Sequence, residues 1–442
     1  MTLHDTLPAD CAALFADLGR AKGLVLAISG GPDSTALMVL VAAWPERPPT
    51  LVVTVDHGLR PEAADEAVMV AANAARLGLP VQIVKAEAIA GRGNLQAAAR
   101  AARYGLLADA ARAAGHDTIV TAHHRDDQAE TFLLRLARGS GVYGLTAMAP
   151  ETDLDGLTLA RPLLGVSRRA LLSIAQDSGL AFADDPSNTD MRYDRVRMRQ
   201  LLPSLAGHGL TAERLAETAG RLGRAAAAID AEATKLLKQA VTINDFGVAH
   251  GDPAPFKAAH PEIALRSLGR LLQAVSGSHY TPGMKSLERL YPAIADGFSG
   301  SVRRTLHGTT VAISRDRFTV VREWGRRGPE SLAVKPGDAV VFDGRFAVSV
   351  PDDDVLMRPN RRRNPLCVGP LGKAPVRAKV SGIGRTALAT LPGLFRGETL
   401  IGLPEQAVFK DDRSPLVSLP ARALVADRLS SPRSLPAFVP PD

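Results

Sequence analysis

The stretch AISGGPDSTA at residues 27–36 lies where a short apolar run gives way to a run of helix-forming residues. The apolar run, GLVLAI at 23–28, is typical of a buried strand, and DSTALMVLVAAW at 33–44 is typical of a helix. Gly30 and Gly31 stand in the turn between them, where backbone N–H groups can face inward without obstruction by a Cβ atom. The first turn of a helix also carries the positive end of its dipole, so this turn is predicted to bind an anion such as a phosphate.

The other residues of this turn suit phosphate binding. Ser29 and Ser34 can donate hydroxyl hydrogen bonds to phosphate oxygens, and Pro32 separates the glycines from Asp33. A carboxylate would repel a phosphate unless a cation lay between them, so Asp33 indicates Mg²⁺. The alternative is an ordinary strand-to-helix turn in which Asp33 or Ser34 caps the helix. The patterns GxxxxGK[ST] and GxGxxG are absent, so neither a Walker loop nor a dinucleotide-binding loop is predicted.

Strand-like and helix-like segments alternate through the first two hundred residues. The predicted strands are 23–28, 50–57, 80–86 and 117–124, and the predicted helices are 33–44, 62–78, 94–115 and 126–139. This alternation predicts an α/β fold, an open parallel sheet with helices on both faces. Ligands of such sheets bind outside the carboxyl ends of the strands, and the glycine turn lies at one of these ends.

The pattern changes after about residue 205. Residues 211–241 are typical of one long amphipathic helix, and TVAISRDRFTVVRE at 310–323 predicts a hairpin that turns at RDR. The remaining sequence is strand-like and punctuated by Gly and Pro. We therefore expect a nucleotide-binding α/β domain at 1–205, a mainly helical domain with a β hairpin at 206–325, and a small β-containing domain at 326–442.

The composition restricts the class of protein. The 442 residues carry a net charge of +7 and a sequence pI of about 9.6. A basic chain favours a polyanionic partner, although a genome that prefers Arg codons is an equal alternative. The two cysteines, Cys11 and Cys367, are too far apart for a CxxC pair, and a reducing cytoplasmic location is expected. No signal peptide or membrane span is predicted.

Two polar clusters follow predicted strands. In VDHGLR at 55–60, Asp56 and His57 would lie at the carboxyl edge beside the glycine turn, although a simple strand-ending turn explains them equally. In TAHHRDDQAET at 121–131, two histidines are expected at the end of a strand and two acids at the start of a helix.

The acids of the second cluster predict a binding pocket. Asp127 and Glu130 are three residues apart, so both carboxylates lie on one face of the helix and could hold an ammonium group. The alternative is that they cap the first turn of the helix. His123 and His124 would point to opposite sides of a strand, which disfavours a metal site there.

Two arginine clusters are further candidates for anion binding. ARAARY at 99–104 places Arg100, Arg103 and Tyr104 on one helix face. A second group of arginines occupies eight consecutive residues: Arg192, Arg195, Arg197 and Arg199. Such a density of guanidinium groups suits phosphate or RNA contact, and a solvated basic helix is the alternative.

The SGGxDS turn resembles the pyrophosphate loop of the N-type ATP pyrophosphatases, which split ATP between its α and β phosphates. In chain order, SGGPDS, DHGLR, ARAARY, AHHRDDQAET, RPLL and DPSNTDMRYDRVRMR closely resemble the bacterial tRNA(Ile)-lysidine synthases over residues 23–203. Looser similarity continues in IALRSLGRLLQAVSGSHYTPGMKSLERL and TVAISRDRFTVVRE, and it is weak in LPGLFRGETLIGLP. VRRTLHGTTVAI stands where many members carry an LGG turn, which leaves the geometry of that turn open.

The resemblance implies a two-step reaction on tRNA. ATP would adenylate C2 of the wobble cytidine of a CAU-anticodon tRNA(Ile), and the ε-amine of free L-lysine would then attack this carbon and expel AMP. It implies that Ser29–Ser34, Asp56 and His57 bind ATP and that Asp33 binds Mg²⁺. Asp127 and Glu130 would bind lysine or take its proton.

The resemblance also implies that Arg103, His123 and Arg195 steady the phosphates and the developing charge, and that the later domains hold the tRNA. A tRNA thiolase of the same superfamily is the alternative, but those enzymes usually carry paired cysteines. A non-catalytic, nucleotide-sensing RNA-binding protein would not need Asp33, Asp127 or Glu130. The sequence leaves a monomer and a homodimer open.

Overall fold

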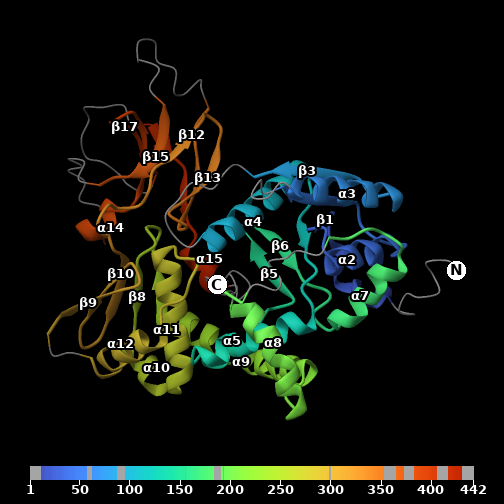
Figure 1. Ribbon diagram of the computed structural model, residues 1–442. Coiled ribbons are helices and arrows are strands. Elements are labelled where there is room, and N and C mark those ends of the chain that lie inside the picture. The colour runs from blue at the N-terminus through green and yellow to red at the C-terminus, as the bar shows by residue number, and fades with distance from the viewer. Residues whose placement is uncertain are drawn as a thin grey trace. The chain divides into compact units, whose positions relative to one another are not determined.

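The residues of the chain group into two units in the computed structural model (Figure 1). The structure describes residues 11–56, 62–86, 95–154, 156–183, 191–192, 194–297, 300–352, 365–372, 383–405 and 417–430. Unit 1 takes in the chain up to Ala226, and unit 2 begins at Ala227. Helix α9 (Ala212–Ala240) contributes residues to both. The three domains expected from the sequence, divided at 205 and 325, stay a prediction.

Unit 1 is built on a six-stranded sheet with the order β3-β2-β1-β4-β6-β5. Its strands are β1 (Leu24–Ala27), β2 (Thr50–Asp56), β3 (Val81–Lys85), β4 (Thr118–Val120), β5 (Glu151–Leu154) and β6 (Leu157–Ala160). Neighbouring strands are parallel except β5, which is antiparallel to β6. The predicted parallel α/β sheet is confirmed. The sequence analysis missed the β5–β6 hairpin because the edge strand β5 is short, polar and partly exposed.

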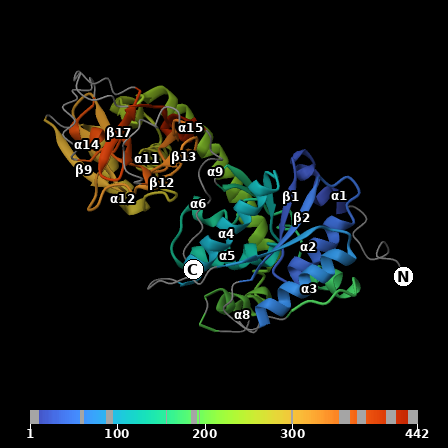
Figure 2. The same cartoon turned by 90° about the horizontal axis from the view of Figure 1, so that it is seen from above.

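Helices cover both faces of this sheet (Figures 1 and 2). The described helices of this unit, besides α9, are α1 (Cys11–Leu14), the 3-10 helix η2 (Ala16–Arg20), α2 (Pro32–Ala42), α3 (Glu62–Arg76), α4 (Leu95–Ala113), α5 (Arg125–Ala137), α6 (Val142–Leu145), α7 (Arg168–Asp177) and α8 (Asp194–Gly207). Leu24 and Leu26 of β1 point into a core shared with α2, α3 and α7, whereas Val25 points into a core shared with α4. Both sides of β1 are therefore apolar, which is why its sequence reads as a continuous hydrophobic run.

Strand β4 is shorter than the predicted 117–124. The backbone N–H of Thr121 still donates to Ala160 O at 3.0 Å, but beyond this point the chain leaves the ladder and α5 begins at Arg125. His123 and His124 therefore lie in the connection between β4 and α5. The expectation that they occupy opposite sides of a strand is wrong, because β4 ends at Val120 and His124 is already the N-cap of α5.

The first part of unit 2 packs helices on a five-stranded sheet with the order β7-β8-β11-β10-β9. The strands are β7 (Val241–Ile243), β8 (Ala249–Gly251), β9 (Val302–Leu306), β10 (Thr309–Ile313) and β11 (Phe318–Arg322), and the helices are α10 (Pro253–Ala258), α11 (Pro261–Ser276) and α12 (Met284–Asp296). The predicted hairpin is the antiparallel β10–β11 pair. His307 and Gly308 connect β9 to β10 with φ of 53° and 69°, so the LHG turn has the two left-handed residues of a type I′ hairpin turn.

The second part of unit 2 contains two sheets, with the orders β12-β15-β16-β17-β18 and β13-β14-β19. The strands are β12 (Leu332–Val334), β13 (Ala339–Phe342), β14 (Phe346–Ser349), β15 (Leu366–Pro370), β16 (Pro392–Arg396), β17 (Thr399–Pro404), β18 (Val417–Leu419) and β19 (Ala421–Ala423), with helices α14 (Arg385–Ala389) and α15 (Val425–Ser430). Helix α15 returns to the helical core, where Val425 and Leu429 are buried. Among the described residues, no helix has the length and apolar character needed to cross a bilayer.

Adjacent leucines of α7 test the core of unit 1. Leu171 is fully buried in the core that α7 shares with α2, whereas Leu172 is 36% exposed. Leu171→Ala should lower the free energy of unfolding by about 2–5 kcal/mol through lost burial and an unfilled cavity. The control Leu172→Ala should lower the free energy of unfolding by less than about 1 kcal/mol. Urea unfolding measures both, and equal losses would contradict this orientation of α7.

Candidate active site

The turn after β1 has the shape of an anion-binding loop. Gly30 has φ of +89°, and a Cβ there would lie 3.3 Å from Met69 Cε. Gly31 is the N-cap of α2 and lacks a side chain to cap the helix, and Pro32 opens the first turn. First-turn N–H groups have no acceptor within their helix, so those of α2 remain to bind a ligand at this edge of the sheet.

Hydrogen bonds between the two serines hold the loop. Ser34 Oγ donates to Gly31 O at 2.9 Å and accepts from the backbone N–H of Ser29 at 3.3 Å. The hydroxyl oxygens of Ser29 and Ser34 are 3.3 Å apart. These contacts close a ring around the glycines, so the loop holds this shape through its own hydrogen bonds.

Asp33 presents two different carboxylate oxygens. Its Oδ2 lies 3.6 Å from His124 Nε2, whereas its Oδ1 is buried and makes no hydrogen bond. A buried carboxylate oxygen without a partner is costly, and a hard cation would satisfy it. Asp33 therefore fits the predicted role as a Mg²⁺ ligand. In the described ranges, no set of three or more His, Cys, Asp or Glu side chains is arranged to hold a metal ion.

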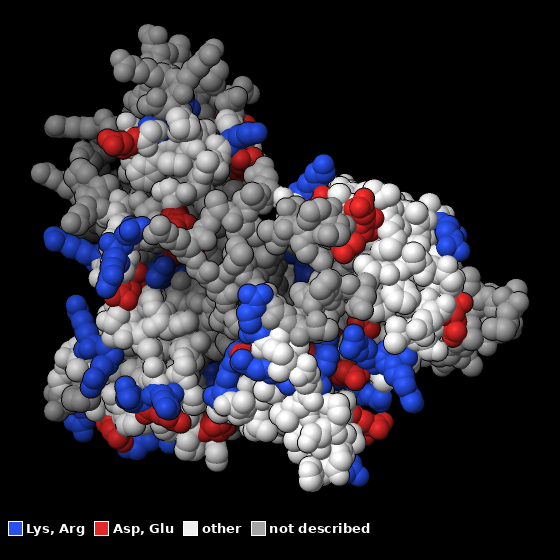
Figure 3. Space-filling view, viewed as in Figure 1, with Lys and Arg blue, Asp and Glu red and all other residues white. Residues whose placement is uncertain are grey.

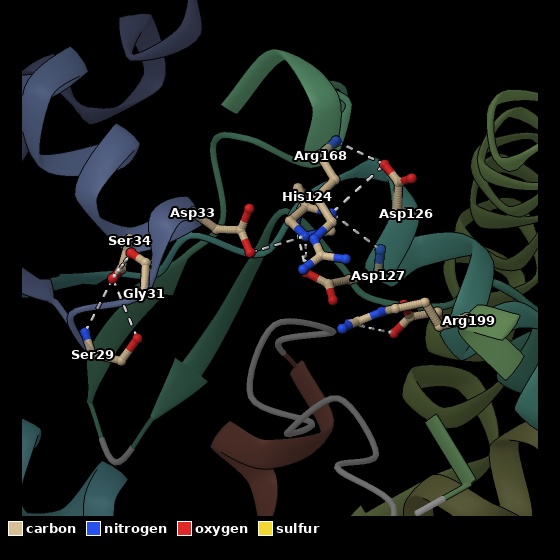
Figure 4. Close-up of polar contacts among 10 residues, drawn as sticks. Ser29, Gly31, Asp33, Ser34, His124, Asp126, Asp127, Arg168 and Arg199 are labelled. Carbon is tan, nitrogen blue, oxygen red and sulfur yellow. Dashed lines mark hydrogen bonds and ion pairs between the residues drawn. The ribbon is translucent and has the colours of Figure 1, made fainter. Parts of the chain in front are cut away.

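His124 lies at the centre of the site (Figure 4). Its side chain is 2% exposed, and its Nε2 lies 3.6 Å from Asp33 Oδ2 and 3.5 Å from Asp127 Oδ2. Its Nδ1 accepts a hydrogen bond from the backbone N–H of Asp127 at 3.3 Å and lies 3.8 Å from Asp126 Oδ2. One imidazole thus contacts both Asp33, in the loop that follows β1, and the acids of α5.

Burial and neighbouring charges act in opposite directions on His124. Burial lowers the pKa of the imidazole, but the polar contact with Asp33 and the charges of Asp127, Asp33 and Asp126 outweigh it, so the pKa lies above its ordinary value. The capping bond, however, needs Nδ1 as an acceptor. The proton of the neutral ring therefore resides on Nε2, which faces the carboxylates.

The acids that open α5 have different partners. Asp127 Oδ2 accepts from the backbone N–H of His124 at 3.0 Å, which completes a capping box. Asp126 Oδ2 accepts from the backbone N–H of Arg168 at 2.9 Å and so ties α5 to α7. The capping alternative considered from the sequence thus accounts for the backbone contacts of Asp127, and its side chain remains 15% exposed beside His124.

Glu130 is engaged by an arginine from α8. Arg199 Nε donates to Glu130 Oε1 at 2.7 Å and Arg199 Nη2 donates to Oε2 at 3.4 Å. Glu130 is 1% exposed, and this burial raises its pKa, although the hydrogen bond and charge of Arg199 act to lower it. For Arg199, burial lowers the pKa, but the bond and charge of Glu130 raise it overall. The two charges stabilise each other in a nearly buried pair.

The remaining predicted residues lie around this centre. Asp56 ends β2, the strand beside β1, and so lies at the same carboxyl edge. His123 contacts Thr121 Oγ1 through Nδ1 at 2.8 Å. Arg195 is the second residue of α8, and its charge acts on Glu130 to lower the pKa of that carboxyl.

Two predicted residues are not tied to the centre by the described contacts. Arg103 lies on α4 with its guanidinium 5.4 Å from the ring centroid of Tyr104. His57 lies outside the described residues. The predicted roles of Asp56, His57, Arg103, His123 and Arg195 stay predictions.

The sequence analysis noted His124, Asp126 and Arg199 within polar clusters but assigned none of them a role in the active site. A signal for His124 was present, because it stands three residues before Asp127 and this is the spacing of a capping box. The arginine cluster marked Arg199 as a candidate for anion binding, but no local signal gives its partner Glu130, which lies 69 positions away in the chain.

Comparison with known proteins agrees with this architecture. Residues 4–205 match the PP-loop domain family, which binds ATP. The chain is therefore an enzyme of the PP-loop ATP pyrophosphatase class.

Its relatives define the family within this class. It is 45% identical over 317 residues to a tRNA(Ile)-lysidine synthase of Methylobacterium sp. strain 4-46, covering 70% of this chain and 91% of that protein. It is 42% identical over 345 residues to a protein of the same name from Bradyrhizobium sp. strain BTAi1, covering 72% and 95%. The chain belongs to the tRNA(Ile)-lysidine synthase family. This confirms the resemblance found in the sequence and favours it over the thiolase alternative.

Gly31 allows a test of the anion loop that leaves the fold intact. A Cβ at this position would meet only Ser29 Oγ, at 3.8 Å, and φ is −73°. Gly31→Ala should therefore change the free energy of unfolding by less than about 0.5 kcal/mol. It should weaken ATP binding by about 10-fold or more, because a hydrogen bond to a charged group is worth about 1.5–3 kcal/mol.

Isothermal titration with ATP and urea unfolding measure these two quantities. Gly19→Ala, also with open space around the new Cβ, is the control and should change neither. Unchanged ATP affinity in Gly31→Ala would show that ligands do not approach this face of the loop.

Substitution of Arg199 should destabilise the folded protein more than substitution of its partner Glu130. Arg199→Met leaves a buried carboxylate unpaired and should lower the free energy of unfolding by about 3–5 kcal/mol near neutral pH. Glu130→Gln should cost less, because the side chain of Arg199 is 28% exposed and can reach water. Arg197→Met, at an exposed arginine of the same helix, should cost less than about 1 kcal/mol.

The cost of Arg199→Met should also depend on pH. Burial holds the folded-state pKa of Glu130 above its ordinary value, and loss of Arg199 raises it further. The protonated carboxyl therefore stabilises the folded state below this value, and that stability is lost as pH rises through the folded pKa. Urea unfolding should show that Arg199→Met loses less stability relative to wild type at about pH 5 than at about pH 8. A loss independent of pH would contradict the assignment to Glu130.

Proposed function

We propose that this enzyme ligates L-lysine to C2 of the wobble cytidine of CAU-anticodon tRNA(Ile), through an adenylated tRNA, with AMP and pyrophosphate as products. The lysidine formed changes decoding from AUG to AUA. One observation carries the proposal beyond family membership: a single imidazole lies within 3.6 Å of Asp33, on the phosphate loop, and within 3.5 Å of Asp127, on α5. A nucleotide-activating group and a candidate amine-binding group therefore share one site.

The first step forms the adenylate. The cytidine O2 attacks the α-phosphorus of ATP, the bond from this phosphorus to the bridging oxygen breaks, and pyrophosphate leaves. The N–H groups and hydroxyls of Ser29–Ser34 hold the phosphates, and Asp56 and His57 are proposed to contribute to ATP binding. Asp33 is the proposed ligand of Mg²⁺, which would neutralise phosphate charge when bound. Arg103, His123 and Arg195 are proposed to stabilise charge that develops in this step.

The second step transfers lysine. The ε-ammonium loses a proton, the amine attacks C2, and AMP leaves with its electron pair. We assign the ammonium site to Asp127 and Glu130. Asp127 is the more exposed of the two and lacks a guanidinium partner among the described contacts, which favours it as the proton acceptor. Glu130, held by Arg199, contributes negative charge at the back of the site.

Basic side chains around α8 support an RNA partner. Figure 3 shows Lys and Arg side chains on the part of unit 1 that carries α5 and α8, with acidic groups between them. The exposed arginines of this region are Arg138, Arg169, Arg192 and Arg197. Guanidinium groups bind phosphates in a bidentate manner, so we propose that these residues contact the tRNA backbone. A homodimer and a cytoplasmic location stay predictions.

Purified protein, ATP, lysine and a CAU-anticodon tRNA(Ile) transcript test the proposal. Wild-type protein should produce AMP and pyrophosphate, and mass spectrometry of the digested tRNA should detect lysidine. Asp33→Asn should lower the rate of pyrophosphate release at least about 100-fold, because a metal-held charge supplies several kcal/mol of transition-state stabilisation. Binding of tRNA, measured by filter retention, should change little, since RNA affinity comes mainly from basic groups.

Asp65→Asn, at an exposed acid of α3, is the matched control and should retain activity. Absence of AMP in the presence of tRNA and lysine would refute the proposal. A thiolated nucleoside in place of lysidine would support the thiolase alternative.

A further inference from the structure

We propose that His124 is a positioning residue that couples the two steps, because one buried imidazole orients both Asp33 of the phosphate loop and Asp127 of α5. The inference rests on the proposed function for the identity of the two steps. The geometric claim itself concerns only how three side chains of this chain hold one another.

The imidazole has little freedom to move. It is 2% exposed, and its backbone is fixed as the N-cap of α5. Nδ1 accepts from the backbone N–H of Asp127 at 3.3 Å, while the backbone N–H of His124 donates to Asp127 Oδ2 at 3.0 Å. These reciprocal bonds define the plane of the ring, so Nε2 is directed at a fixed place between α2 and α5.

Nε2 then meets carboxylates from two separate elements. It lies 3.6 Å from Asp33 Oδ2 and 3.5 Å from Asp127 Oδ2 (Figure 4). With Oδ2 of Asp33 turned to the imidazole, Oδ1 is the oxygen left buried without a hydrogen bond. His124 therefore selects which oxygen of Asp33 is available to a cation, and it selects the rotamer that presents it.

The neighbouring histidine provides a natural comparison. His123 directs Nδ1 to Thr121 Oγ1 at 2.8 Å, within the connection that follows β4. Although the sequence analysis singled out His123, the contacts that join the loop to α5 belong to His124.

Two substitutions separate the coupling from simple helix capping. Asparagine places a polar atom near the position of Nδ1, so His124→Asn retains an N-cap but cannot reach Asp33. Glutamine places an amide N–H near the position of Nε2, so His124→Gln retains a donor to Asp33 but is a poor N-cap. A capping role and a positioning role therefore predict opposite rankings of the two variants.

The experiment measures Mn²⁺, as a spin-active substitute for Mg²⁺, bound with ATP to the full-length protein by electron paramagnetic resonance. His124→Asn should weaken Mn²⁺ binding by at least about 10-fold, the usual effect of losing a group that orients a metal ligand. His124→Gln should bind Mn²⁺ within about threefold of wild type, although urea unfolding should show it to be the less stable variant. His208→Asn, at an exposed histidine just after α8, is the control and should leave Mn²⁺ affinity unchanged.

Kinetics of the two steps add a second readout. His124→Asn should raise both the Mg²⁺ concentration needed for half-maximal pyrophosphate release and the KM for lysine, whereas Asp127→Asn should impair lysine transfer without raising that Mg²⁺ concentration. Mn²⁺ affinity that follows stability across the variants, or that is unchanged in His124→Asn, would overturn the inference. Failure of wild-type protein to form AMP would instead refute the proposed function, and the Mn²⁺ titration would still decide the role of His124.

Discussion

The contact of the buried His124 imidazole with three carboxylates is the interaction on which the candidate active site depends. Three acids gathered in a partly dry site would repel one another, and the repulsion is stronger there than in water. The imidazole offsets this repulsion through Nε2, which faces Asp33 and Asp127, while Asp126 is held by the backbone of Arg168. Without this group, α2 and α5 would present their acids with no common partner between them.

The parallel sheet makes this contact possible. Strands β1 and β4 are hydrogen-bonded neighbours, so the loops that leave their carboxyl ends emerge side by side. The first loop leads to Asp33 on α2 and the second leads to His124 and α5. Apolar side chains on both faces of β1 hold these strands rigidly, because the sheet is covered on both sides. A rigid scaffold thus positions polar groups that come from distant parts of the sequence.

Arginine serves two purposes in this chain. Some arginines are buried and donate to backbone carbonyls, as Arg135 does to Gly144 O at 2.8 Å and to Ala147 O at 2.7 Å. Burial, together with the charges of nearby arginines, lowers the pKa of Arg135 to about 10. Others, such as Arg138 and Arg197, are exposed. The net charge of +7 is therefore not a direct measure of the surface charge available to RNA.

The sequence by itself determined the parallel α/β fold, the strand-to-helix loop with its two glycines, and the placing of Asp127 and Glu130 on one helix face, because these depend on local periodicity and backbone preference. Only the tertiary structure decided that His124 contacts Asp33 and that Arg199 pairs with Glu130. The end of β4 at Val120 also belongs to the tertiary structure, since it depends on where the ladder to β6 stops. Side-chain partners far apart in sequence are set by strand order and helix packing, which no local pattern encodes.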